Sequence, residues 1–258
     1  MFDLKNRAFL FLLASATAFS IAACSDDDDN GGNGTPDTGT DTTEPPVDMA
    51  MVRVMHASWD APAVDIYING AAPEAGSALD AITFGNGTAY LEVPAGSYDI
   101  AVVPDGGTLE DAVFSADGVA LGADTATTFW AYGGLGSESF GVGVISDPTD
   151  VSEEEVTLIV AHAAANVGPV DVWVDGDPTL LDIDISEATS PANLPTGTYE
   201  VGVALAGEES TALDFTAPLT SPAFITVFAV GDLEEEIGVY LVALLPNGTT
   251  LAIQPIER

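Results

Sequence analysis

The chain has 258 residues, of which 47% are hydrophobic, so it is long enough for one large domain or two small ones with a core in each. Lys and Arg total 4 against 41 Asp and Glu, and the formal net charge of -37 argues against binding to nucleic-acid phosphates. The single Cys excludes an intramolecular disulfide and a Cys-rich zinc site, and two His residues are too few for a multi-His metal centre.

Residues 1–23 have the features of an export signal. Lys5 and Arg7 supply the positive charge at its start, and the apolar stretch that follows is too short to span a bilayer as a helix. The signal ends in Ile-Ala-Ala-Cys at 21–24, the pattern of a bacterial lipoprotein signal. We therefore expect cleavage before Cys24 and lipids on that residue, which would anchor the chain to a membrane. An ordinary signal peptide with a chance Cys is the alternative.

Residues 24–48 form the expected tether between the anchor and the folded part. They are almost all Asp, Asn, Gly, Thr, Pro and Glu, so they cannot bury apolar surface and are predicted to be disordered. The Ser-Asp-Asp-Asp-Asp run at 25–29 fits transfer to the outer membrane and resembles the surface-export signal of some bacterial lipoproteins. A plain acidic tether is the alternative. We expect a lipid-anchored envelope protein, at the outer membrane or the cell surface.

An internal repeat follows the tether. Four blocks recur in the same order, at 52–57 and 158–163, 64–70 and 170–176, 94–100 and 195–201, and 129–133 and 227–231. Four matching blocks in one order indicate two homologous domains. We place these domains at 49–147 and 154–258, with a short acidic linker between them.

Each copy is predicted to be all-β. Strand signals recur about every 8–12 residues between Gly, Pro, Asn and Asp, and no stretch has sustained helical periodicity. Around Tyr98, apolar and polar residues alternate, which is typical of an antiparallel sheet with one face in water. We expect two tandem antiparallel β-sandwiches, immunoglobulin-like or prealbumin-like, with a barrel as the alternative fold.

The first blocks resemble a known family. The sequence Val-Arg-Val-Met-His-Ala-Ser-x-Asp-Ala-Pro-x-Val-Asp-Ile-Tyr-Ile-Asn-Gly at 52–70 is similar to the opening signature of the bacterial and archaeal domain of unknown function 4397, and the block at 93–98 fits the same family. The second copy departs from this signature at 164–168, so a ligand site in this loop would belong to the first copy. The resemblance implies exported, surface-associated β-domains, often in tandem, and brings no established activity.

Residues shared by both copies are interpreted mainly as structural. His56 and His162 stand at equivalent strand ends, where a buried His would bond to a loop backbone; a metal site with Asp60 or Asp65 is the alternative. Asp65 and Asp171 are unusual inside strands, so each is expected to accept backbone N–H bonds or to line a ligand groove. The repeated Pro-x-Gly-x-Tyr block adds Gly96, Tyr98, Gly197 and Tyr199 to the structural residues.

The candidate ligand-binding loop lies in the first copy and contains Trp59 and Asp60, with Asp65 beside it. Trp59 is the aromatic side chain most expected to be exposed, where it could contact a glycan or a protein. Asp65 could also pair with His56, and the nearby negative charge would then raise the pKa of the His56 ring.

Acid clusters suggest calcium, although neither has the spacing of an EF-hand loop. The clusters are Asp175, Asp177, Asp182 and Asp184, and Asp105, Glu110 and Asp111. We expect solvated loops without a cofactor, with calcium as the weaker alternative. No catalytic residue is expected, because the chain has no Gly-x-Ser-x-Gly motif and no Lys after Lys5.

These patterns predict a non-enzymatic envelope lipoprotein that presents two modules for binding or adhesion. A structural spacer or assembly component is the alternative function. A carbohydrate-binding accessory or a secreted hydrolase is a weaker one. The expected partners are the membrane, through the lipid on Cys24, and a protein or glycan at the cell surface, but no nucleic acid.

Overall fold

The computed structural model describes residues 47–136 and 140–256, and these residues belong to one compact unit. Cys24, the predicted export signal and nearly all of the predicted tether lie outside the described residues. Within the described part of the chain, no helix has the length and apolar character needed to cross a membrane.

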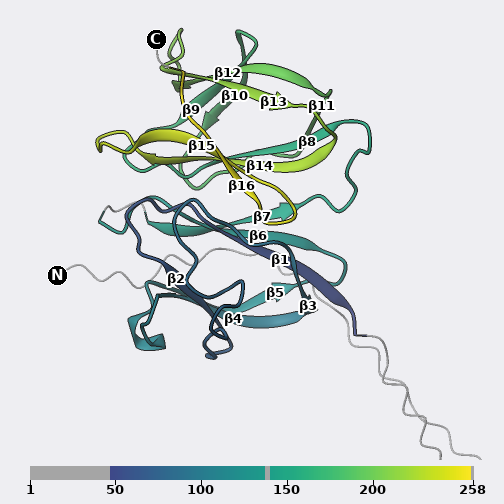
Figure 1. Cartoon of the computed structure of the whole chain (residues 1–258), viewed down its shortest axis with the longest axis vertical. Helices are drawn as coiled ribbons and strands as arrows, with labels where there is room; N and C mark the ends of the chain where they lie inside the picture. The colour runs from purple at the N-terminus through teal and green to yellow at the C-terminus, as the bar shows by residue number, and fades with distance from the viewer. Residues whose placement is uncertain (1–46, 137–139, 257–258) are drawn as a thin grey trace, which may run out of the picture. The chain divides into compact units, whose positions relative to one another are not determined.

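The first copy contains seven strands and a short 3-10 helix (Figure 1). They are β1 (Met49–His56), β2 (Val64–Ile68), β3 (Leu91–Pro94), β4 (Gly96–Pro104), η1 (Leu109–Asp111), β5 (Phe114–Leu121), β6 (Ala126–Tyr132) and β7 (Gly141–Asp147). The second copy repeats these strands and adds β10 and β16. Its strands are β8 (Val156–His162), β9 (Val170–Val174), β10 (Asp177–Ile183), β11 (Ala192–Leu194), β12 (Gly197–Leu205), β13 (Leu213–Leu219), β14 (Ala223–Asp232), β15 (Gly238–Leu244) and β16 (Thr250–Ile253).

Each copy is a sandwich of two open sheets. The strand orders are β3-β1-β6-β7 and β2-β4-β5 in the first copy, and β11-β8-β14-β15-β16 and β10-β9-β12-β13 in the second. The predicted all-β fold with two tandem sandwiches is therefore confirmed. The alternative fold, a barrel, is wrong, because the sheets of the described residues are open. The pairing is not wholly antiparallel as predicted, because β1 pairs with β6, and β8 with β14, in parallel. The opening strand of each copy lies inside its sheet, next to a strand from late in the same copy.

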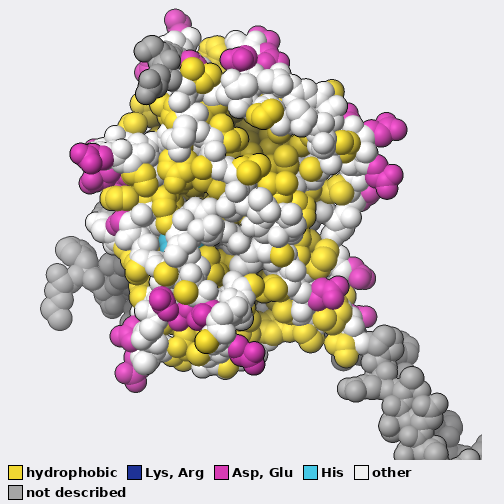
Figure 2. Space-filling model, viewed as in Figure 1, with side chains coloured by type: hydrophobic (Ala, Val, Ile, Leu, Met, Phe, Trp, Pro, Cys, Tyr) yellow, Lys and Arg dark blue, Asp and Glu magenta, His cyan; other side chains and the backbone are white. Residues whose placement is uncertain are grey.

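Apolar clusters lie between the two sheets of each sandwich. In the first copy, Val64, Ile66 and Val102 from one sheet pack with Val54 and Val142 from the other. The equivalent cluster of the second copy includes Val172, Val203, Phe215, Ala229 and Leu241. These side chains occupy alternate positions along their strands, so the period-2 pattern of the sequence places them on one face of each sheet. Asp and Glu side chains lie around the outside of the face shown in Figure 2.

A third apolar cluster joins the two copies. Met55 and Trp130 from the first copy pack with Ile159 and Phe228 from the second. The ring centroids of Trp130 and Phe228 are 5.6 Å apart. This cluster covers the second face of two sheets, so β1, β6, β8 and β14 are buried on both sides.

Arg53 is fully buried in this contact between the copies. Its Nε donates a hydrogen bond to Thr128 Oγ1 at 2.8 Å, and its Nη2 donates one to Thr226 Oγ1 of the second copy, also at 2.8 Å. Its guanidinium carbon lies 4.6 Å from the ring centroid of Tyr90 and 5.0 Å from that of Phe224. One side chain of β1 therefore contacts both copies.

Asp147 supplies a negative charge beside this guanidinium. Its Oδ2 lies 3.7 Å from Arg53 Nε and accepts hydrogen bonds from Tyr90 Oη at 2.6 Å and Thr128 Oγ1 at 2.5 Å. Burial lowers the pKa of Arg53, and Asp147 opposes that change; burial also raises the pKa of Tyr90. An ion pair therefore lies within an apolar interface, where loss of either partner would leave an uncompensated charge.

Candidate functional site

His56 ends β1, and its ring is buried. Its Nε2 lies 3.0 Å from the carbonyl oxygen of Pro62, so this nitrogen must carry the proton and donate it. Its Nδ1 is buried and has no hydrogen-bond partner among the described residues. Burial lowers the pKa of His56, which favours the neutral ring. The expected rise in this pKa through a pair with Asp65 is therefore wrong.

His162 stands at the position of His56 in the second copy and bonds the loop that follows β8. Its Nε2 lies 3.2 Å from the carbonyl oxygen of Gly168, and its Nδ1 accepts a hydrogen bond from Ala164 N at 3.3 Å. Burial lowers the pKa of His162 as well. The same ring therefore bonds the same part of the loop in both copies, as expected for a structural residue that fixes a strand end.

Asp60 joins two loops of the first copy. Its Oδ1 accepts a hydrogen bond from Leu135 N at 2.6 Å, and its Oδ2 accepts one from Gly136 N at 2.8 Å. The carboxylate proposed for ligand binding is thus occupied by the backbone of the β6–β7 loop. Trp59 beside it is half-buried, and its Nε1 is buried without a partner among the described residues. Trp59 is therefore less exposed than the sequence suggested.

The second copy joins the same two loops with a different pair of residues. Asn166 stands at the position of Asp60, and its Nδ2 donates to Asp232 Oδ2 at 2.7 Å. Asp232 is itself buried, and its Oδ1 accepts a hydrogen bond from Glu234 N at 2.8 Å. The sequence difference at 164–168 therefore changes how the loops are held together without separating them.

The strand aspartates accept backbone hydrogen bonds, one of the two roles expected for them. Asp171 Oδ1 accepts one from Asp182 N at 2.8 Å, and its Oδ2 accepts one from Gly207 N at 3.0 Å. In the first copy, Asp65 Oδ1 accepts one from Ala81 N at 2.8 Å. Both aspartates are buried and hold later segments of their own copy against the start of β2 or β9.

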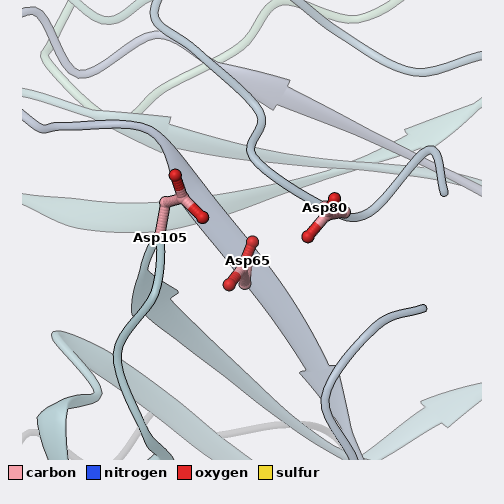
Figure 3. A group of neighbouring side chains, drawn as sticks. All are labelled: Asp65, Asp80 and Asp105. Atoms are coloured by element: carbon pink, nitrogen blue, oxygen red, sulfur yellow. The ribbon is translucent and has the colours of Figure 1, made fainter. Parts of the chain in front are cut away.

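Asp65 also belongs to a group of three carboxylates (Figure 3). Asp65, Asp80 and Asp105 each offer an oxygen, and these oxygens lie within 4.8 Å of one another. They come from β2, from the loop after it and from the residue that follows β4. With one oxygen from each residue, the group would supply three of the six to eight oxygens that calcium takes. Matching hydrogen bonds in the second copy place Leu181 and Ala206 at the positions of Asp80 and Asp105, so only the first copy has the group.

The acid clusters expected from the sequence do not assemble in this way within the described residues. Asp105 is in the group, but Glu110 and Asp111 are not. Asp111 instead accepts hydrogen bonds from the backbone N and the Oγ1 of Thr108, both at 2.9 Å. In the second cluster, Asp175 accepts a hydrogen bond from Glu200 N at 3.0 Å.

The Pro-x-Gly-x-Tyr blocks brace the start of β4 and β12. Tyr98 Oη donates to the carbonyl oxygen of Pro94 at 2.6 Å, and Tyr199 Oη donates to that of Pro195 at 2.7 Å. Each ring lies against the glycine two residues earlier, Gly96 or Gly197. The four signature residues therefore have the same structural role in both copies.

Sequence reasoning missed the buried network around Arg53. The repeat could have revealed this network, because Arg53 is equivalent to Ile159 of the second copy in the matched blocks. Ile159 is fully buried. A charged residue at the position of a buried Ile needs hydrogen-bonding partners. Those partners, Thr128 and Asp147, lie on other strands and follow only from the strand pairing.

The fold and the matched loop bonds define a protein built from two tandem β-sandwich modules. The chain belongs to the family described as Domain of unknown function (DUF4397), whose model matches residues 50–172 and 156–251. These two matches confirm the family resemblance and the tandem copies. No curated protein matches the chain.

Proposed function

We propose that this protein is a non-enzymatic, lipid-anchored protein of the cell envelope that presents two β-sandwich modules for binding or adhesion. The order of parts along the chain carries the proposal. The only Cys stands at 24 in a lipoprotein pattern, a polar acidic segment follows it, and a compact unit of two sandwiches comes next. A folded unit held by a lipid through a polar segment would be free to contact partners at the outer membrane or cell surface.

The loops of the first copy support a binding role for that copy. Trp59 stands where the second copy has Ala165, and the carboxylates of Asp80 and Asp105 have no counterparts in the second copy. A half-buried indole next to Asp60 in the chain suits contact with a glycan or with a protein surface. The net charge of -37 makes a nucleic-acid partner unfavourable.

A structural spacer is the second candidate function, and the contact between the copies favours it. The apolar cluster around Trp130 and Phe228, together with the Arg53 hydrogen bonds to both copies, would resist bending between the modules. A stiff pair of modules suits a component that sets a distance within the envelope.

Lipid attachment is tested with the full chain expressed in a bacterial host. Cys24→Ser should abolish incorporation of radiolabelled palmitate and move the protein out of the detergent phase in phase partitioning. Thr38→Ala, a change in the segment that follows Cys24, should leave both properties unchanged. Palmitate incorporation that persists in Cys24→Ser would contradict the anchor.

Surface display is tested by protease treatment of intact cells, followed by an immunoblot for the two modules and for a periplasmic marker. Loss of the modules with the marker intact would support binding or adhesion at the surface. Protection until the outer membrane is broken would favour the spacer. Digestion in lysed cells provides the control, because it shows that the folded modules are accessible to the protease.

Ligand binding is tested on a glycan array and with cell-surface protein extracts. Trp59→Ala gives the first copy the residue that the second copy has, and it should weaken selective binding by about tenfold. Leu205→Ala removes an exposed apolar side chain from the second copy and should leave binding unchanged. Turnover of a polysaccharide by the pure protein would contradict the non-enzymatic proposal.

A further inference from the structure

The second sandwich contains an apolar cavity of about 310 Å³ between its two sheets. The walls are inward-facing aliphatic side chains, including Val172, Val201 and Val203 from one sheet and Val227 and Leu241 from the other. Figure 2 shows hydrophobic side chains around a hollow in the upper part of the view. The volume lies in the range of small-molecule sites in proteins.

Water is a poor occupant for this cavity. A buried water needs two to four polar partners, and the polar groups of His162 and Tyr199 in the lining are already bonded. His162 Nε2 and Nδ1 pair with Gly168 and Ala164, and Tyr199 Oη donates to Pro195. The backbone of the walls is paired within the two sheets. An apolar occupant would contact these walls without leaving any polar group unpaired.

One end of the cavity reaches the surface at the β13–β14 turn. Thr220 and Ser221 in this turn line the cavity and are exposed, and Leu251 of β16 lines it with 54% of its surface exposed. No Lys or Arg lines the cavity, and Arg53, the one Lys or Arg within the described residues, is buried between the copies. Two hydroxyl groups without a positive charge suit an uncharged polar group better than a carboxylate or a phosphate.

We propose that this cavity binds the hydrocarbon chain of a neutral single-chain lipid, with the hydroxyl groups of the lipid beside Thr220 and Ser221. The first copy has larger side chains at two of the equivalent positions. Phe129 occupies the position of Val227 there, and Val144 occupies the position of Ala243. The smaller side chains of the second copy help to leave the space open.

The test uses the purified full chain and the neutral fluorescent probe N-phenyl-1-naphthylamine. Probe fluorescence should rise to saturation at one probe per chain. Monododecanoyl glycerol, kept below its micelle concentration, should displace the probe, whereas dodecanoate at the same concentration and neutral pH should not. Val227→Phe should weaken probe binding by about tenfold, because the ring takes up cavity space.

Two further variants keep the test decisive. Ala243→Val is a smaller filling change and should weaken binding by about threefold even if Val227→Phe fails to fold. Val144→Phe makes the same change as Val227→Phe at an exposed site of the first copy and should bind the probe as the unchanged protein does. Absence of probe binding, or full binding by folded Ala243→Val, would overturn the site. Equal displacement by dodecanoate would overturn the neutral head group.

Discussion

Arg53 shows what a single difference between the two copies requires of its surroundings. The matching residue is Ile159, which needs only apolar neighbours, whereas the guanidinium is surrounded by two Thr hydroxyls, a carboxylate and two aromatic rings. A buried ion pair is not in itself strong evidence of stabilisation, because desolvation opposes the attraction between the charges. Removal of Arg53 or Asp147 alone should nevertheless lower the free energy of unfolding, because the other charge stays buried.

Arg53→Met should lower the free energy of unfolding by about 3–5 kcal/mol, because it leaves the Asp147 carboxylate buried without its counter-charge. Urea denaturation followed by circular dichroism measures the loss. Adding Asp147→Asn to Arg53→Met should restore part of it, since the amide carries no charge. A loss of less than 1 kcal/mol in the single variant would show that water reaches this carboxylate.

The buried His rings predict that stability falls as the pH is lowered. Burial lowers the pKa of both rings below the usual value of 6.5, so the unfolded chain binds protons before the folded one does. Below pH 6.5 each ring should therefore lower the free energy of unfolding by up to about 1.4 kcal/mol per pH unit, until the pH reaches the lowered pKa of that ring. Above pH 6.5 the rings should have no such effect. Urea midpoints between pH 7.5 and 5.5 measure the slope. His56→Gln should reduce it, and an unchanged slope would contradict neutral burial.

Residue roles were predictable where both copies keep the same residue. The His and Tyr pairs, and the strand aspartates, make closely similar bonds in the two copies, so a repeated residue at a strand end indicated a structural role. Asp60 was not predictable in this way. Its partners, Leu135 and Gly136, lie 75 and 76 residues away and contribute only backbone N–H groups, which have no sequence signature.

At the scale of strands, the alternation of apolar and polar residues identified the strands. It did not indicate what covers each face of a strand. In β1, Val54 packs into the sandwich of its own copy, whereas Met55 packs against the other copy. Both positions are apolar, so the sequence does not distinguish a face covered by the same domain from one covered by its neighbour. The parallel pairing of β1 with β6 was also missed, because a short strand has the same alternation in either direction.

The β6–β7 loop should become mobile when Asp60 is changed to Ala. The amides of Leu135 and Gly136 would lose their acceptors, so hydrogen exchange measured by mass spectrometry should accelerate in the peptide that contains them. Asp232→Ala is the matched control, because Asp232 supports the equivalent loop of the second copy. This control should leave the β6–β7 peptide unchanged. Equal exchange in Asp60→Ala and the unchanged protein would show that other contacts hold the loop.

At the scale of the whole molecule, the two sandwiches are expected to unfold together. The shared cluster contains large side chains from both copies, so unfolding one copy would expose the apolar face of the other to water. Calorimetry should give a van't Hoff enthalpy equal to the calorimetric enthalpy. A ratio near one half would indicate independent copies. Phe228→Asp, which places a carboxylate in the shared cluster, should move the ratio toward that value.

The tandem arrangement was predictable because the four repeated blocks keep one order along the chain. The contact between the copies was not, because matching blocks indicate equivalent positions in the two copies and do not indicate which faces touch. The cavity of the second sandwich was missed for a related reason. Val227 and Ala243 are ordinary residues of neighbouring strands in one sheet, and the space in front of them depends on how far away the other sheet lies.

The position of β1 has a mechanical consequence. Under the proposed anchoring, drag on the molecule is transmitted into the folded unit at Met49, where β1 begins. This strand is hydrogen-bonded to β3 on one side and to β6 on the other. A pull along its axis loads both rows of bonds in shear, so many must break at once, whereas a strand at a sheet edge could peel away one bond at a time. The attachment point would therefore resist the force exerted by fluid flow or by a bound surface.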